Sequence, residues 1–350
     1  MPIEFVPAVR DRTRLIISFA GPTGSGKTRS ALECARGLAA HPGEDLNDPA
    51  TLAIVDARIK AIDTENGRLL FFAPKRGQKL GKGVFGFLHG NMRPPYPPAA
   101  YMAALEQGAQ GCEVLMIDSF SHEWDGEGGM HDMHTEALER MMARNPNLSE
   151  DSVSSLAWRD PKMEHRRLVS KMLQIAPYLI VCLRAEDKLL IERVPVNPDN
   201  PKGPKKTVFV PASERPLEDR WVPICDKRFP FEITISLGMT PEKPGVPYAI
   251  KLNDEHRFAV DLTKQVTPEM GRLLSDWANG RDGAPAGDPG LVAELLPAAW
   301  GSWSNEERGA NRALAGVAAF RSWWKTLAPA DKELLKKNLP EWQSTAEKKP

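Results

Sequence analysis

The sequence feature that most constrains the fold is the segment GPTGSGKT, residues 21–28, which directly follows the apolar run Leu15–Ala20. The segment fits the pattern GxxxxGK[ST] without a mismatch. The apolar run contains β-branched residues and predicts a buried strand, and the residues from Lys27 to Ala40 predict a helix. A glycine-rich loop between a strand and a helix lets backbone N–H groups turn inward and surround an anion at the positive end of the helix.

This loop predicts a site for a nucleoside triphosphate with Mg²⁺. Lys27 is expected to reach the β- and γ-phosphates, and the Thr28 hydroxyl is expected to bind the metal. A glycine-rich turn without a ligand is the alternative interpretation, which the flanking strand and helix disfavour. The expected phosphate-binding residues are Gly21, Pro22, Thr23, Gly24, Ser25, Gly26, Lys27 and Thr28.

Two strand ends that carry carboxylates follow the loop in the sequence. Asp118 ends the apolar run of EVLMIDS, where it would hold the Mg²⁺ shell, and an ordinary turn residue is the alternative. The segment KAIDTENG places Asp63 and Glu65 two residues apart, so in an extended chain both side chains point to the same side. Taken alone, this pair is either a solvated strand end before the Asn66-Gly67 turn or a pair of groups aimed at a ligand.

Three motifs in the order GPTGSGKT, AIDTENG and VLMIDSFSHEW resemble those of the RecA-like recombination ATPases. The set DTENGR, IDSFSHEWDGEGG, WRDPKMEH and VCLRAEDK narrows the resemblance to RecA-like ATPases encoded by phages and prophages, over residues 13–262. This resemblance implies a RecA-like P-loop core that hydrolyses ATP in phage-type DNA recombination or repair, by single-strand annealing or strand exchange. It also implies single-stranded DNA as a partner, a homo-oligomer as one assembly, and a place in the host cytoplasm.

The resemblance assigns a catalytic role to Glu65, which at the matching position orients and polarises the attacking water, with Asp63 as support. The chain departs from RecA where a strand usually ends in Asn-Gln, because here the strand ends in Arg184. Arg184 is either a charged sensor of the γ-phosphate, since a guanidinium binds phosphate through two hydrogen bonds, or a surface residue paired with Glu186 or Asp187.

Strands and helices alternate over residues 1–280, which predicts an α/β fold with a mostly parallel central sheet and a later antiparallel portion. The Gly- and Pro-rich segment 281–290 is typical of a linker. The Trp-rich residues 291–350 predict a small helical module, whose tryptophans form a core or, alternatively, stack on bases. The resemblance implies that this module docks recombination partner proteins. The predicted strands are 51–64, 113–118, 178–184 and 231–237, others within 247–262, and a hairpin of 189–194 with 207–210; the predicted helices are 99–107, 161–175, 304–327 and 329–338.

The overall charge is balanced, because the 46 basic residues equal the 46 acidic residues, and no global field draws the chain to nucleic acid or to a membrane. The four cysteines include no CxxC pair, which favours reduced thiols. No apolar run is long enough to span a membrane, and the first residues lack the apolar core of a signal peptide. We therefore expect a soluble, cytoplasmic protein without a membrane partner.

Two polar segments carry residues that could bind ligands. Residues 121–160 contain His122, His131 and His134 among acidic residues, at a spacing that matches no standard zinc pattern. A mobile loop is expected there, with a metal site or a DNA contact as alternatives. The predicted loop 197–206 carries three lysines, which are expected to be surface residues, with phosphate contacts as the alternative.

Two other functions fit the same phosphate-binding loop. One is a nonenzymatic switch that binds ATP and recruits recombination partners, and the other is a P-loop small-molecule kinase. A kinase needs a lid with arginines, and no arginine-rich lid is evident in the sequence. The variant Glu65→Gln separates a hydrolase from a switch, because in a hydrolase it abolishes turnover and keeps nucleotide binding.

Overall fold

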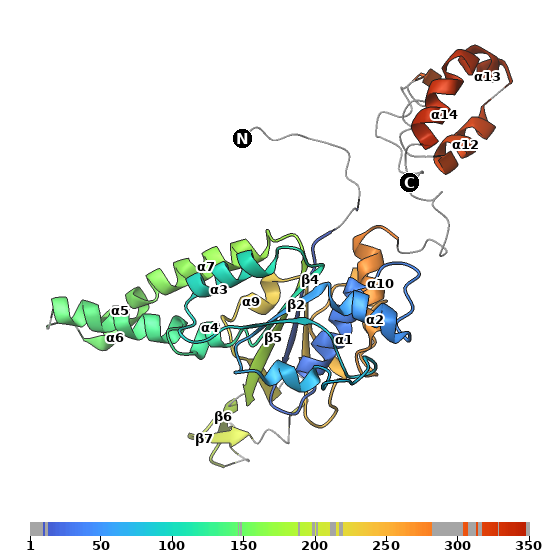
Figure 1. Cartoon of the computed structure of the whole chain (residues 1–350). Coiled ribbons are helices and arrows are strands. Elements are labelled where there is room, and N and C mark those ends of the chain that lie inside the picture. The colour runs from blue at the N-terminus through green and yellow to red at the C-terminus, as the bar shows by residue number, and fades with distance from the viewer. Residues whose placement is uncertain are drawn as a thin grey trace. The chain divides into compact units, whose positions relative to one another are not determined.

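The computed structural model of the chain divides into two compact units, residues 14–275 and residues 1–13 together with 276–350 (Figure 1). Each unit is described by itself. The residues that the structure describes are 10, 13–145, 147, 149–187, 190–197, 200, 202–210, 215–216, 220–281, 304–306, 313, 317–327 and 329–347.

A mostly parallel sheet forms the centre of residues 14–275. Within the described residues, eight strands join it in the order β10–β9–β1–β5–β4–β2–β3, with β8 beside the end of β5. All neighbours from β9 to β3 are parallel, whereas β10 and β8 run antiparallel to their partners. β1 and β4 are apolar runs buried along their whole length, as strands between two helical layers require. The bounds are β1 Ile16–Gly21, β2 Ile59–Asp63, β3 Leu88–Asn91, β4 Val114–Asp118, β5 Tyr178–Asp187, β8 Trp221–Pro223, β9 Ile235–Met239 and β10 Pro247–Lys251.

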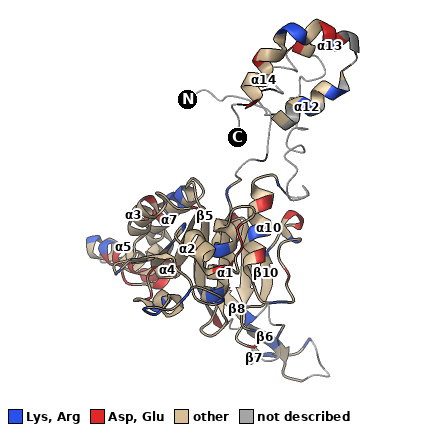
Figure 2. Cartoon of the chain, turned by 45° about the vertical axis from the view of Figure 1, so that its right-hand side comes forward, with Lys and Arg blue, Asp and Glu red and all other residues tan. Residues whose placement is uncertain are grey.

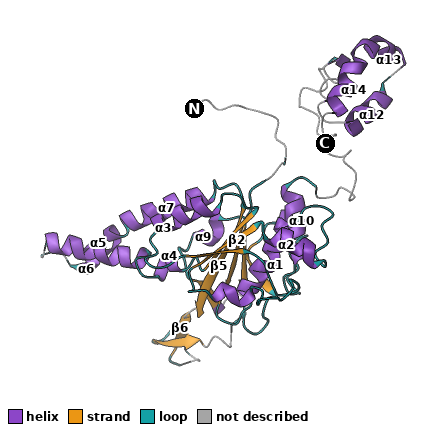
Figure 3. Ribbon diagram, viewed as in Figure 1, coloured by secondary structure: helices purple, strands orange, loops and turns teal. Residues whose placement is uncertain are grey.

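Helices cover both faces of this sheet. α1 (Lys27–Ala39) packs on β1, β4 and β5, while α3 (Pro98–Gly108) and α7 (Arg159–Met172) pack together on the opposite side (Figures 1 and 3). One apolar core lies between the sheet and this second layer, where Leu105 and Leu168 are fully buried. The predicted α/β class with a mostly parallel sheet is confirmed, and a specifically RecA-like core stays a prediction.

The single strand predicted over residues 51–64 is wrong in its first half. A helix, α2 (Pro49–Asp56), precedes β2 there. The side chain of Asp48 accepts a hydrogen bond from Thr51 N at 2.8 Å, and Pro49 occupies the first helical turn. An Asp cap followed by Pro is a helix start signal that outweighs the apolar alternation of the residues behind it.

The mobile loop predicted over residues 121–160 is also wrong. The described residues there form α4 (His122–Asp125), α5 (Met130–Arg144) and α6 (Glu150–Ala157). Helices α5 and α6 lie side by side through a small apolar cluster (Figure 1). The many charged residues of α5 hide this narrow apolar face in the sequence. The cluster consists of Ala137, Leu138, Val153 and Ala157.

The hairpin predicted around the lysine-bearing loop is confirmed, since β6 (Leu190–Pro195) and β7 (Lys205–Val210) pair antiparallel. The strand predicted at 231–237 begins later than expected. A one-turn helix, α9 (Phe229–Glu232), precedes β9, because the carboxylate of Asp226 accepts a hydrogen bond from Arg228 N at 2.9 Å and starts a turn.

Residues 317–347 of the second unit form a small helical bundle. Phe320, Trp323 and Trp342 pack at its centre with ring centroids 6.0 to 6.1 Å apart, so the predicted core role of these two tryptophans is confirmed. The last helix was not predicted. Apart from Arg281, the predicted linker lies outside the described residues. The helices are α12 Val317–Thr326, α13 Pro329–Leu335 with a short 3₁₀ turn Lys336–Asn338, and α14 Leu339–Glu347.

Basic and acidic residues are interspersed along the described elements, as Figure 2 shows. Among the described residues, no helix is long and apolar enough to cross a membrane. The cysteines are free thiols, as predicted, and Cys34, Cys182 and Cys225 are buried.

Candidate functional site

Residues 21–28 form a tight loop between β1 and α1. Gly24 and Gly26 have φ values of 83° and 84°, in the left-handed region that glycine adopts without strain. Gly21 is constrained differently, because a Cβ on it would lie 2.4 Å from Ser25 Oγ. The backbone therefore has the glycine-dependent curvature that the motif predicts.

The loop between β9 and β10 holds this segment from outside. Gly245 N donates a hydrogen bond to Ser25 O at 2.8 Å. A Cβ on Gly26 would lie 2.7 Å from Gly245 N, so only glycine permits this approach. Thr23 and Gly24 remain exposed at the tip of the loop, where a ligand can reach the backbone.

Lys27 and Thr28 are the first two residues of α1, and they bring an ammonium and a hydroxyl group to the site. Lys27 is only 9 % exposed, and within the described part of the chain its ammonium forms no ion pair. A buried charge without a partner is costly. The Thr28 hydroxyl donates to Asp118 Oδ2 at 2.6 Å. An unpaired ammonium beside a carboxylate-bound hydroxyl suits a site that receives an anion together with a cation.

Asp118 ends β4 at the same level as Asp63 on β2 and Cys182 on β5. Its side chain is almost fully buried, and its Oδ1 has no hydrogen-bond partner among the described residues. Burial raises the pKa of Asp118 to about 6, against the lowering effects of the Thr28 hydrogen bond and the Lys27 charge. A Mg²⁺ ion, or a water bound to it, would satisfy the free oxygen, so these residues fit the predicted metal.

Asp63 and Glu65 lie in contrasting environments. Asp63 is fully buried and holds the turn after β2, because its Oδ1 accepts from Glu65 N at 2.7 Å and its Oδ2 accepts from Leu69 N at 3.0 Å. His89 Nε2 lies 3.1 Å from the same Oδ2. The carboxylate of Glu65 instead pairs with a side chain, because its Oε2 lies 3.1 Å from Arg68 Nη1. Asp63 thus supports the turn that presents Glu65.

A polar cavity of about 300 Å³ brings the three predicted catalytic residues together. Lys27 from α1, Glu65 from the turn after β2 and Arg184 from β5 all line it. The parallel register of β1 and β5 pairs Gly21 with Arg184, which places the arginine beside the start of the glycine loop. The other lining residues are Thr23, Arg68 and His122.

Arg184 is anchored by a partner that the sequence did not suggest. Its Nη2 donates to both oxygens of Asp125, at 2.5 and 2.6 Å, so the predicted alternative of a pair with Glu186 or Asp187 is wrong. Asp125 lies on α4, just after the strand that carries Asp118. Arg184 Nε is buried and has no hydrogen-bond partner within the described residues. The guanidinium therefore borders the cavity with hydrogen-bonding capacity to spare.

Two lining residues, His122 and Arg68, were not predicted. His122 Nδ1 lies 2.7 Å from Thr64 Oγ1, and its ring stacks on Tyr96 at a centroid distance of 5.1 Å. Thr64 Oγ1 also accepts from Ser119 N at 2.8 Å, so Thr64 links the ends of β2 and β4, and the imidazole contacts this link. Burial lowers the pKa of His122, which favours the neutral ring. His122 could have been expected at the site, because it follows Asp118 closely in the segment DSFSH. The interpretation of residues 121–160 as a loop obscured this position.

The other two histidines of this region pack against an indole. His134 stacks on Trp158 at 4.4 Å, and His131 meets the same ring edge-on at 5.5 Å. Over the described ranges, no group of three or more His, Cys, Asp or Glu side chains could hold a metal ion. Thr28 and Asp118 alone would leave most of a Mg²⁺ shell to phosphate and water, which is usual for this ion.

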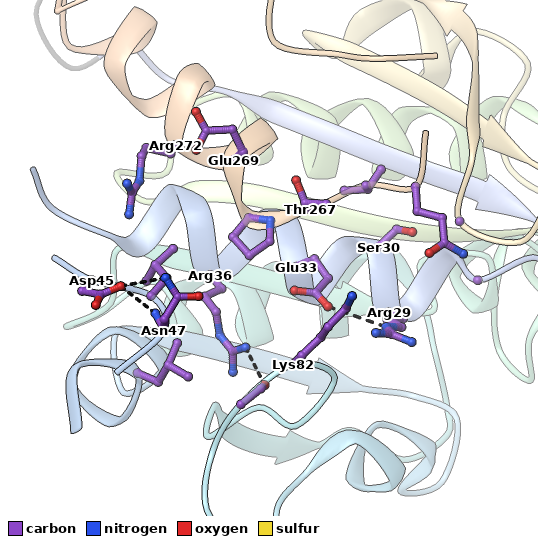
Figure 4. Close-up of a pocket in the computed structure, with 18 of the residues that line it drawn as sticks. Arg29, Ser30, Glu33, Arg36, Asp45, Asn47, Lys82, Thr267, Glu269 and Arg272 are labelled. Atoms are coloured by element: carbon purple, nitrogen blue, oxygen red, sulfur yellow. Dashed lines mark hydrogen bonds and ion pairs between the residues drawn. The ribbon is translucent and has the colours of Figure 1, made fainter. Parts of the chain in front are cut away.

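A second cavity, of about 630 Å³, adjoins the glycine loop at Gly26 and runs along α1. Figure 4 shows Arg29 and Glu33 of α1 facing it, with Lys82 and Thr267 contributed by other segments. Glu33 is only 6 % exposed, and its contact with Arg29 is long, at 3.6 Å. Burial raises the pKa of Glu33. The cavity is large enough for the part of a nucleotide that extends beyond the phosphates.

No protein-family model matches this chain, and no curated protein matches it.

Proposed function

We propose that this chain is a P-loop ATPase with a RecA-like core, which binds ATP with Mg²⁺ and hydrolyses it. The observation that carries the proposal is the hydrogen bond from Thr28 Oγ1 to Asp118 Oδ2 at 2.6 Å, beside the unpaired ammonium of Lys27. Together with the unsatisfied Asp118 Oδ1, these groups match a bound phosphate chain and its metal ion.

The proposal assigns separate roles to the residues that bind the phosphates, hold the metal ion and activate water. The loop amides and Lys27 hold the phosphates, and Thr28 and Asp118 hold the metal ion. Bound Mg²⁺ supplies positive charge that offsets the charge on the transferred phosphoryl group. Glu65 orients the attacking water and accepts its proton, and Arg184 contacts the γ-phosphate.

Glu65 has to exchange Arg68 for water in this scheme. Arg68 has a side chain that is 59 % exposed, and an ion pair with such a partner contributes only about 0.2–1 kcal/mol. Breaking this ion pair therefore costs little free energy. A positioned general base accelerates a reaction by roughly 10²- to 10⁴-fold, which is a much larger effect.

The wider biological role rests on the motif resemblance alone. On that basis we propose that the ATPase acts in phage-type DNA recombination or repair, by single-strand annealing or strand exchange, and assembles as a homo-oligomer. The helical unit around Trp323 would dock a recombination partner. The nucleoside part of ATP would occupy the cavity along α1, which begins at the glycine loop.

Calorimetric titration of the full chain with ATP, with and without Mg²⁺, tests the metal and phosphate assignment. We expect Mg²⁺ to tighten ATP binding to the wild-type chain and to have little effect on the Asp118→Asn variant. Asp160→Asn, at an exposed position away from the cavity, serves as the control and should behave as wild type. Wild type that binds no ATP, or an Asp118→Asn variant with the full Mg²⁺ effect, would overturn the proposal. A nonenzymatic switch would pass this titration, so turnover has to be measured separately.

A further inference from the structure

A groove of about 510 Å³, which we call the Trp124 groove, shares α4 but no lining residue with the polar cavity at Lys27. We call that polar cavity the phosphate cavity, after its proposed ligand. It is lined by α4, α7 and the segment before α9, which occupy the same side of the sheet (Figure 3). Its aromatic and basic lining consists of Trp124, Trp158, Lys162, Arg166, Lys227 and Arg228.

The two indoles present aromatic surface to this groove. Trp124 and Trp158 stack with centroids 5.5 Å apart and an interplanar angle of 14°. His134 stacks on Trp158 as well, which fixes that ring. Both indoles are nevertheless partly exposed, and both line the groove. Partly exposed, fixed aromatic planes are the surfaces on which unpaired nucleobases stack.

The basic residues of α7 that do not line the groove form ion pairs. Arg159 and Arg167, which do not line it, are paired with Asp160 and Glu164. Lys171 is likewise paired, with an acidic residue of α3.

The cations that do line the groove are free to bind a ligand. Lys162, Arg166, Lys227 and Arg228 are exposed, and none forms an ion pair within the described residues. Lys162 instead lies 5.6 Å from the centroid of the Trp158 ring. Only two acidic side chains line the same groove in the described part of the chain, those of Asp226 and Glu232. The groove therefore carries an excess of positive charge in a molecule with no net charge.

We infer that the Trp124 groove binds single-stranded nucleic acid, with the cations on phosphates and the indoles against bases. A duplex is disfavoured, because its bases stack on one another and offer no free face to an indole. An acidic peptide would use the cations alone and would leave the fixed indole pair without a purpose. This inference gives a site to the nucleic-acid partner of the proposed recombination role and in that respect rests on the proposed function, but its observations do not involve the ATP site.

Binding of a labelled oligothymidylate of about 20 nucleotides to the full chain, without nucleotide, tests the inference by fluorescence anisotropy. The double variant Arg166→Glu, Arg228→Glu should weaken binding about tenfold or more at low salt and flatten its salt dependence. Arg167→Glu reverses a neighbouring, exposed cation outside the groove and should change the affinity less than about twofold. Trp124→Leu keeps an apolar side chain and should weaken binding about fivefold, as loss of one stacking surface does.

Several outcomes would overturn the inference. They are no binding by wild type at low salt, equal losses for the groove variant and Arg167→Glu, tighter binding of a duplex of the same length, or equal competition by polyglutamate. The oligonucleotide is measured without ATP, so a failure of the ATPase proposal would leave this result unchanged, and the reverse also holds.

Discussion

The two sides of α4 hold sites that are assembled in different ways. On one side, the phosphate cavity is built from short motifs at the carboxyl ends of neighbouring strands, where Asp63, Asp118 and Cys182 stand level in the sheet. On the other side, the Trp124 groove collects residues from α4, α7 and the segment before α9. A contiguous motif fixes the first site, whereas only tertiary packing creates the second.

The short helix between them touches both sites. Asp125 binds Arg184 at the phosphate cavity, and the adjacent Trp124 lines the groove. Glu123 is fully buried, and its Oε1 lies 2.9 Å from His165 Nδ1. This hydrogen bond links α4 to α7. The two sites are thus distinct in composition but share one rigid element, and variants on either side can show how independent they are.

The largest expected effect comes from Lys27→Ala. Loss of the buried ammonium should lower ATP turnover about 10²- to 10³-fold, because one charged donor to the reacting phosphates is removed. Oligonucleotide binding at the groove should stay within about twofold of wild type if the sites are separate. Lys75→Ala, an exposed lysine outside the cavity, serves as the control in the same phosphate-release and anisotropy assays. Loss of oligonucleotide binding in Lys27→Ala would show that the two sites are one.

Arg184→Ala should have the next largest effect. Removal of a charged hydrogen-bond donor to the γ-phosphate costs about 1.5–3 kcal/mol, which lowers turnover roughly 10- to 100-fold. Asp125→Asn leaves the guanidinium in place and should lower turnover far less. If steady-state rates of the two variants fall equally, Arg184 merely anchors Asp125, and the sensor assignment is lost.

The smallest expected effect concerns the link between α4 and α7. Burial opposes the charge on His165, but the hydrogen bond and charge of Glu123, with Asp226 and Glu232, outweigh it and raise the pKa of His165. The folded chain therefore favours the protonated ring, and this stabilisation is complete below about pH 6.5 and is lost as the pH rises through the raised pKa. Urea unfolding should show that His165→Gln costs about 1.5 kcal/mol near pH 6 and less near pH 8. A pH-independent loss would exclude a charged pair.

The sequence predicted that Lys27, Glu65 and Arg184 belong to one site, and all three line one cavity, because their positions follow local rules. The glycines at 24 and 26 need positive φ, and a carboxylate at the end of a buried strand can be recognised from the strand itself. Arg184 was predicted to end a strand, but β5 continues to Asp187, and the partner of Arg184, Asp125, belongs to a helix that the sequence did not reveal. The same polar composition concealed α5 and α6, whose apolar cluster has four buried side chains with Met141 and Met142 packed against them.

The groove could not be predicted, since no local rule relates Trp124 to Arg228. Its residues become neighbours only when α7 packs on α3 and positions its exposed face beside α4 and α9. The distinction between paired and unpaired cations on α7 is likewise a property of the folded chain, because it depends on which acidic side chains lie within reach.

The central claim is that this chain hydrolyses ATP with Glu65 as the residue that activates water. The most direct test is phosphate release from ATP in the presence of Mg²⁺ by wild type and Glu65→Gln, with ATP affinity measured in parallel by calorimetry. We expect turnover by Glu65→Gln to fall about 10²-fold or more while the affinity for ATP changes little. Equal turnover in the two proteins, or no turnover by wild type that binds ATP, would contradict it.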